Sequence, residues 1–100
     1  MNARRNTKEE KVTLRLYIAG GAPHSTQAQA NLRAIFEDYV PPDGCQLEVV
    51  DVLDEPKRAL EDGVFVTPTL VKLAPTQVRI VGTLNDQKKV ARLLGLEHES

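Results

Sequence analysis

The 100-residue chain has a single cysteine, Cys45, no tryptophan and only four aromatic residues. One cysteine cannot form an internal disulfide or a Cys-x-x-Cys redox pair, and this usage fits a reducing compartment. Four aromatic side chains are too few to build a platform for stacking nucleic-acid bases. The composition therefore argues against dithiol chemistry and against base stacking.

The sequence also lacks a long apolar run and a marked excess of charge. Charged residues make up 27% of the chain and the formal net charge is −1, so bulk electrostatics predict no nucleic-acid and no membrane partner. No apolar segment approaches the roughly 20 residues of a membrane helix. The polar start lacks the apolar core of a signal peptide. These absences predict a cytoplasmic protein.

Composition divides the chain into a flexible polar arm at residues 1–11, one domain at 12–96 and a short tail at 97–100. The arm mixes basic and acidic side chains, as solvated termini commonly do. A chain of this size buries roughly 60–70% of its unfolded surface. We therefore expect one domain with a modest core.

The first half has the pattern of a βαβ unit. Apolar residues alternate over 12–19, which predicts a strand, and recur at spacings of three and four over 23–39, which predicts a helix. Pro23 suits the first turn of that helix, and Pro41-Pro42 ends it. The apolar segment at 46–53 is the second strand, parallel to the first.

The second half predicts a short helix, a hairpin and a final helix. Their signals are turn and cap residues between short apolar runs. Asp54 is the expected cap of the short helix, with Pro56 in its first turn and Gly63 at its end. Two strands, at 69–73 and 77–81, flank the turn Ala74-Pro75-Thr76 and form the hairpin. The final helix is capped by Asn85 or Thr83 and runs to about Leu94, with Gly95 as its C-terminal cap. The order β-α-β-α-β-β-α is that of an α/β thioredoxin-like fold.

Pro68 lies inside a β-rich run at 64–73. Proline cannot donate to a sheet ladder, so it belongs at the first residue of a strand, at an edge or at a bulge. We place it at the mouth of the strand 69–73. A proline entering a strand after a βαβ unit is typical of a thioredoxin-like sheet, where its peptide bond is usually cis.

No catalytic, cofactor-binding or metal-binding residue is predicted. The loop 20–25, where a thioredoxin oxidoreductase holds its nucleophilic cysteine, contains no sulfur. We interpret Ser25 as a helix cap, His24 as a surface residue and Cys45 as a structural thiol. Glu48 and Asp51 lie three residues apart on a strand, hence on opposite faces, which does not favour acid–base catalysis.

From 12 to 94 the chain resembles the KaiB family of circadian-clock proteins. Several motifs in the same order carry the resemblance, and no single one would be specific. They are Leu16-Tyr17-Ile18-Ala19-Gly20 with Ala22-Pro23 and Ser25, Val50-Asp51-Val52-Leu53 with Pro56 and Ala59, and Thr67-Pro68-Thr69-Leu70 with Lys72, Pro75, Val78-Arg79-Ile80, Val81-Gly82 and Leu84.

The resemblance implies a non-enzymatic clock or stress-timing protein that binds a KaiC-type ATPase ring and uses no cofactor. In the full clock such proteins also sequester KaiA and affect a histidine kinase. Two alternatives stay open: a thioredoxin-like sensory domain of a histidine kinase, and a thiol redox protein, which the missing Cys-x-x-Cys argues against. A homo-oligomer, dimer or tetramer, is compatible with the resemblance.

The family also implies two folds for one sequence, the thioredoxin-like form that binds KaiC and a tetrameric resting form with a rearranged C-terminal half. Such packings need differ by only a few kcal/mol. We expect Pro68, Gly82, Leu93 and Gly95 to bias this equilibrium. The last helix of the family commonly carries Gly-Leu-Asp where this chain has Leu93-Leu94-Gly95, and replacing a helix-interior glycine by leucine favours helix by roughly 0.5–1 kcal/mol. This predicts a preference for the thioredoxin-like form.

The resemblance places the KaiC-binding surface on the second strand, which maps to Gln46, Glu48 and Val50. The family often has a lysine at the position of Glu48. This charge reversal predicts a partner with a compensating basic patch.

Overall fold

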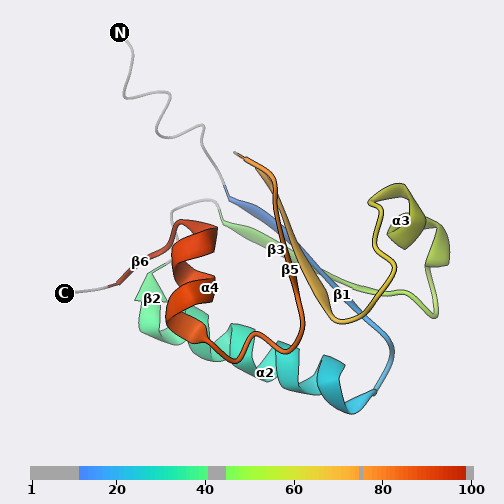
Figure 1. Cartoon of the computed structure of the whole chain (residues 1–100), viewed down its shortest axis with the longest axis horizontal. Helices are drawn as coiled ribbons and strands as arrows, with labels where there is room; N and C mark the ends of the chain where they lie inside the picture. Colours follow the sequence, from blue (N-terminus) through green and yellow to red (C-terminus); the bar gives the residue numbers. More distant parts are fainter. Residues whose placement is uncertain (1–11, 41–44, 75, 99–100) are drawn as a thin grey trace, which may run out of the picture.

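The computed structural model describes residues 12–40, 45–74 and 76–98. The expected arm at 1–11, the prolines at 41–42, Pro75 in the hairpin turn and the tail end at 99–100 lie outside the described residues. The fold is the predicted thioredoxin-like α/β arrangement (Figure 1).

The predicted βαβ unit is confirmed. β1 (Thr13–Ile18) and β3 (Gln46–Asp51) pair in parallel and are joined through α2 (Pro23–Asp38). β3 ends at Asp51 rather than Leu53, because the Asp51 carboxylate accepts a hydrogen bond from the Leu53 N–H at 3.0 Å. Side chains that bond two residues onward in this way close turns and compete with a sheet ladder.

The second half contains α3 (Pro56–Glu61), the antiparallel hairpin of β4 (Thr69–Ala74) and β5 (Val78–Val81), and α4 (Gln87–Leu94). The four main strands lie in the order β3-β1-β4-β5, with β4 antiparallel to both of its neighbours. The Thr67–Pro68 peptide is cis and immediately precedes β4. A small second sheet of β2 (Tyr39–Val40) and β6 (Glu97–His98) had no sequence signal.

Helices cover both faces of the sheet. Leu14 and Leu16 of β1 point to the face that packs against α2 and α4, where Leu32, Ile35 and Leu94 complete the larger core cluster. Tyr17 points to the opposite face, which is covered by α3 and its following loop. Figure 1 shows α3 and α4 at opposite ends of the molecule's long axis.

Three predicted helix caps are wrong. Ser25 lies inside α2, where its buried hydroxyl accepts a hydrogen bond from the Ala19 N–H at 3.0 Å, and the N-cap is Ala22. Pro56 is the first residue of α3, so its N-cap is Glu55 rather than Asp54.

The cap of α4 is Asp86, whose carboxylate accepts from the Lys89 N–H at 3.2 Å. Asn85 precedes that cap, and its side-chain oxygen accepts a hydrogen bond from Asn31 of α2 instead. The glycine predictions hold: Gly95 ends α4 with a left-handed φ of 78°, and Gly63 follows α3 with a φ of 69°.

Polar contacts fasten α3 to the sheet. The carboxylate of Asp62, the C-terminal cap of α3, accepts from the Tyr17 hydroxyl and from Arg15 at 2.7 Å. The Arg79 guanidinium of β5 donates to the backbone carbonyls of Asp62 and Gly63 at 2.7 and 2.8 Å. A six-residue helix is marginal in isolation, so these contacts and the apolar side chains beneath it hold it in place.

Leu94→Ala should lower the free energy of unfolding by about 2–5 kcal/mol, because it empties fully buried core volume between α4 and the sheet. Leu93→Ala is the matched control: the neighbouring leucine is 41% exposed, and we expect a loss below about 1 kcal/mol. Urea unfolding followed by circular dichroism measures both. Equal losses would contradict the packing of α4.

Asp62→Asn should flatten the dependence of stability on acid pH. Hydrogen bonds from Tyr17 and then Arg15 hold the pKa of the Asp62 carboxyl below its ordinary value. A lowered folded-state pKa adds stability that is present above the unfolded-state pKa of about 3.9 and is lost as pH falls through the folded-state value.

We therefore expect the wild-type free energy of unfolding to fall more steeply than that of Asp62→Asn as pH drops from about 5 to about 2. At neutral pH the variant should be the less stable protein. Glu37→Gln, on the exposed side of α2, controls for removal of a carboxylate. Parallel pH curves for wild type and Asp62→Asn would rule out this anchoring role.

Candidate partner-binding surface

Strand β3 forms one edge of the sheet. Its neighbour in the four-stranded sheet is β1, so along its outer side no strand of the described chain pairs with it. The backbone N–H and C=O groups of a free edge are a template for a strand from another chain. This places the three predicted partner-binding residues on an edge.

The two faces of β3 differ in what they present. Gln46 and Glu48 are exposed on the α3 face, whereas Val50 on the same face is completely buried beside Tyr17. On the α2 face, Leu47 and Val49 are 41% and 45% exposed. The apolar side chains that this strand offers to a partner are therefore Leu47 and Val49. The alternation within 46–51 was the available signal for them.

A shallow groove of about 190 Å³ adjoins these two side chains on the α2 face. It is mainly apolar and lies between α2 and the edge strand. Its walls are Leu16, Gln29, Leu32, Arg33, Phe36, Leu47 and Val49. An apolar groove beside a free strand edge can bind main chain along the edge and a side chain in the groove.

The charge of Glu48 is already matched inside the chain. Its carboxylate accepts from Arg58 of α3 at 2.6 and 2.7 Å and from Arg15 at 3.2 Å. The hydrogen bonds from Arg58 are the main cause that lowers the pKa of Glu48 to about 2. Arg58 and Arg15 of this chain therefore compensate the negative charge of Glu48, where the family often has a lysine. These ion pairs lie at the surface, so solvent screens them.

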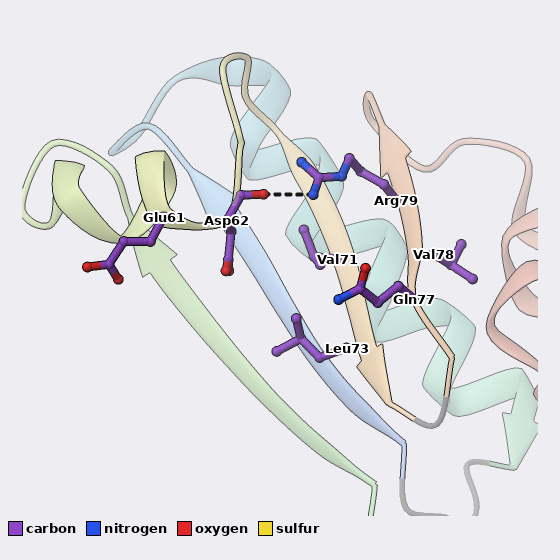
Figure 2. A pocket seen from close by; sticks show the side chains of 7 residues that line it. All are labelled: Glu61, Asp62, Val71, Leu73, Gln77, Val78 and Arg79. Atoms are coloured by element: carbon purple, nitrogen blue, oxygen red, sulfur yellow. Dashed lines mark hydrogen bonds between the residues drawn. The ribbon is translucent and has the colours of Figure 1, made fainter.

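A larger pocket of about 370 Å³ lies on the other face of the sheet, where α3 stops short of the β4–β5 hairpin. Val71 and Leu73 of β4 form part of its lining (Figure 2). The Arg79 guanidinium at its rim is directed at the end of α3 and donates to two backbone carbonyls. Those bonds use one N–H of each terminal nitrogen and hold the guanidinium against the end of α3.

His24 and Cys45, two side chains with catalytic potential, do not lie together in a reactive site. His24 is exposed on α2, and Cys45 is half-buried against the core just before β3. Burial raises the pKa of the Cys45 thiol, which disfavours the reactive thiolate. Across 12–40, 45–74 and 76–98, no group of three or more His, Cys, Asp or Glu side chains could hold a metal ion.

The four residues expected to bias the fold all lie in the C-terminal half. The Gly82 N–H donates to the Pro68 carbonyl at 2.9 Å, which joins the two ends of the β4–β5 hairpin, and Gly82 has a φ of 115°. Leu93 is half-exposed on α4, and Gly95 ends that helix.

Within the described part of the chain, no helix is long and apolar enough to cross a membrane.

Solved structures similar to this chain are thioredoxin-like. The germline-specific thioredoxin Deadhead from Drosophila melanogaster matches with a TM-score of 0.67 and 15% identity, covering 92% of this chain and 86% of its own. The N-terminal domain of SasA from Synechococcus elongatus matches with a TM-score of 0.67 and 25% identity, covering 86% of this chain and 85% of that domain. These likenesses show the thioredoxin-like fold.

Curated relatives give the family. The chain is 43% identical to the circadian clock protein KaiB3 of Synechocystis over 88 residues, which cover 87% of this chain and 83% of that protein. It is 45% identical to the circadian clock oscillator protein KaiB of Prochlorococcus marinus (strain MIT 9312) over 85 residues, covering 84% and 78%. The KaiB domain model matches residues 15–96. The chain therefore belongs to the KaiB family.

Proposed function

We propose that this protein is a non-enzymatic clock or stress-timing component that binds a KaiC-type ATPase ring in the cytoplasm. The observation that carries the proposal is the half-exposed pair Leu47 and Val49 beside the free edge of β3, in a chain of the KaiB family. Apolar contacts next to an unpaired edge supply affinity, and the groove against α2 supplies a place for a partner side chain.

The ion pairs of Glu48 with Arg58 and Arg15 affect how this surface would select its partner. Because Arg58 and Arg15 already satisfy the carboxylate, a partner's basic group would have to compete with them. Selectivity then rests on the apolar pair and the groove rather than on a single charge. Rim charges of this kind change association rates and salt dependence more than affinity.

A non-catalytic role is supported by the loop between β1 and α2. Residues 19–25, which span this loop and the first residues of α2, contain no cysteine, and the Ser25 hydroxyl in α2 is buried and accepts a hydrogen bond from the Ala19 N–H. Cys45 lies outside this loop and is half-buried. The groups that thiol redox chemistry requires at the start of α2 are therefore replaced by groups that shape the turn.

A second candidate is a sensory module that engages histidine-kinase signalling. It is favoured by the likeness to the N-terminal domain of SasA, at 25% identity. The KaiB relatives are more similar, at 43–45% identity, and support the ring-binding role first. The two functions are separated by testing the ring and the kinase from the same genome as binding partners.

Val49→Asp should weaken co-elution with the KaiC-type ATPase of the same genome by at least about tenfold, because it places a charge where an apolar contact is buried on binding. Co-elution is measured with ATP and with ADP, on a ring shown to hydrolyse ATP. Val81→Asp is the matched control, a valine 62% exposed on the opposite edge strand β5. It should bind as the wild type does.

If wild type and both variants co-elute equally, β3 is not the docking edge. If the wild type does not co-elute in either nucleotide state, the ring-binding proposal is wrong, and the histidine-kinase alternative is the next to be tested.

The proposed function includes a choice between two folds, with Leu93 favouring the thioredoxin-like one. Leu93→Gly should weaken α4 by roughly 0.5–1 kcal/mol. Because a rearranged form would lack this helix, its population should rise by roughly two- to fivefold. Amide hydrogen exchange of α4 and a second set of NMR cross-peaks measure the change. Faster exchange of α4 without a second set of peaks would mean that Leu93 stabilises the helix but does not bias the choice between two folds.

A further inference from the structure

The pocket between the end of α3 and the β4–β5 hairpin has the size of a small-molecule site. Its volume of about 370 Å³ lies in the range of roughly 300–1,000 Å³ that small-ligand sites commonly have. It lies on the face of the sheet opposite α2, away from the groove beside Leu47 and Val49. A ligand in this pocket would therefore not occupy the proposed partner-binding surface.

The floor of the pocket is aliphatic. Val71 is 4% exposed, and Leu73, two residues further along β4, is partly buried on the same face. Figure 2 shows the Gln77 side chain, which comes from the residue before β5, directed over β4 toward this floor. The pocket thus places an amide group beside two apolar side chains.

The Arg79 guanidinium at the rim is held in a fixed orientation, and its charge is not paired. Two of its N–H groups donate to the carbonyls of Asp62 and Gly63 at 2.7 and 2.8 Å, and a guanidinium has five, so three remain. Within the described ranges no carboxylate lies within 4.0 Å of it, whereas Arg15 and Arg58 both form ion pairs. A group already held by neutral acceptors loses little freedom when a ligand binds.

The two carboxylates in the pocket lining do not cancel that charge. The Asp62 carboxylate pairs with Arg15 at 2.7 Å, and the Glu61 side chain extends away from the pocket floor (Figure 2). The groups that face the pocket, taken together with Arg15, therefore have an excess of positive charge. Such a charge beside an aliphatic floor favours an anion with an apolar body.

We propose that this pocket binds a small aliphatic carboxylate, with its carboxylate group on Arg79 and Gln77 and its aliphatic body on Val71 and Leu73. The paired N–H groups of a guanidinium match the two oxygens of a carboxylate, and an amide N–H can donate a further hydrogen bond. None of these four residues belongs to the surface formed by β3 and α2, so the inference goes beyond the proposed function.

Titration of the ¹⁵N-labelled protein with 4-methylpentanoate, a carboxylate with a branched aliphatic body, tests the proposal. The amide cross-peaks of Val71, Leu73 and Arg79 should shift to saturation, with a dissociation constant in the millimolar range or below. 4-Methylpentanamide has the same shape without the charge, and acetate has the charge without the body. Each should bind at least about tenfold more weakly, because each lacks one of the two contacts.

Gln77→Glu should weaken the binding of 4-methylpentanoate at least about tenfold, because it places a competing carboxylate beside Arg79. Gln77 is exposed, and circular dichroism with thermal melting checks that the variant folds. Gln27→Glu is the matched control, since it makes the same chemical change at an exposed position of α2. It should bind 4-methylpentanoate as the wild type does.

The proposal is overturned if 4-methylpentanoate causes no saturable shifts. It is also overturned if the amide or acetate binds equally well, since the contact would then be apolar or electrostatic alone, or if Gln77→Glu keeps the wild-type affinity. Val49→Asp, which alters the proposed partner-binding surface, should bind 4-methylpentanoate as the wild type does. Loss of ring binding and loss of carboxylate binding are therefore distinguishable.

Discussion

The carboxylate of Asp62 is the constraint on which one whole face of the sheet depends. α3 has only six residues, too few to persist without tertiary contacts, yet it covers the apolar side chains of Tyr17, Val50 and Val71. Asp62 binds the Tyr17 hydroxyl and Arg15 of β1, and its backbone carbonyl binds Arg79 of β5. One residue thus joins α3 to a central strand and to an edge strand.

The elements with clear periodicity could be predicted from the sequence. The alternation of β1, the apolar stripe of α2 and the position of Pro68 before β4 gave the architecture. The caps could not be chosen correctly, because the choice depends on distant partners: Asn85 is engaged by Asn31, 54 positions earlier in the chain. The two-residue strands β2 and β6 are too short to show a period.

The sequence predicts partner-binding residues on β3, and the structure shows that one of them, Val50, is buried under α3. Val50 lies in a run of apolar residues where sequence alone does not show which face α3 will cover. The pairing of Glu48 with Arg58 was equally hidden, since it forms only when α3 folds back over β3. The contacts of a residue on β3 depend on how α3 packs over the sheet, and the local sequence of β3 does not show that packing.

The Arg79 contact makes the register of the β4–β5 hairpin a long-range property. Arg79 sits opposite Val71, on the face that α3 covers. A slip of one residue would turn every β5 side chain to the other face, and the carbonyls of Asp62 and Gly63 would lose their donor. The β4–β5 hairpin and α3 are therefore coupled. A change in the alignment of β5 at the edge of the sheet would remove hydrogen bonds that hold α3 on its face.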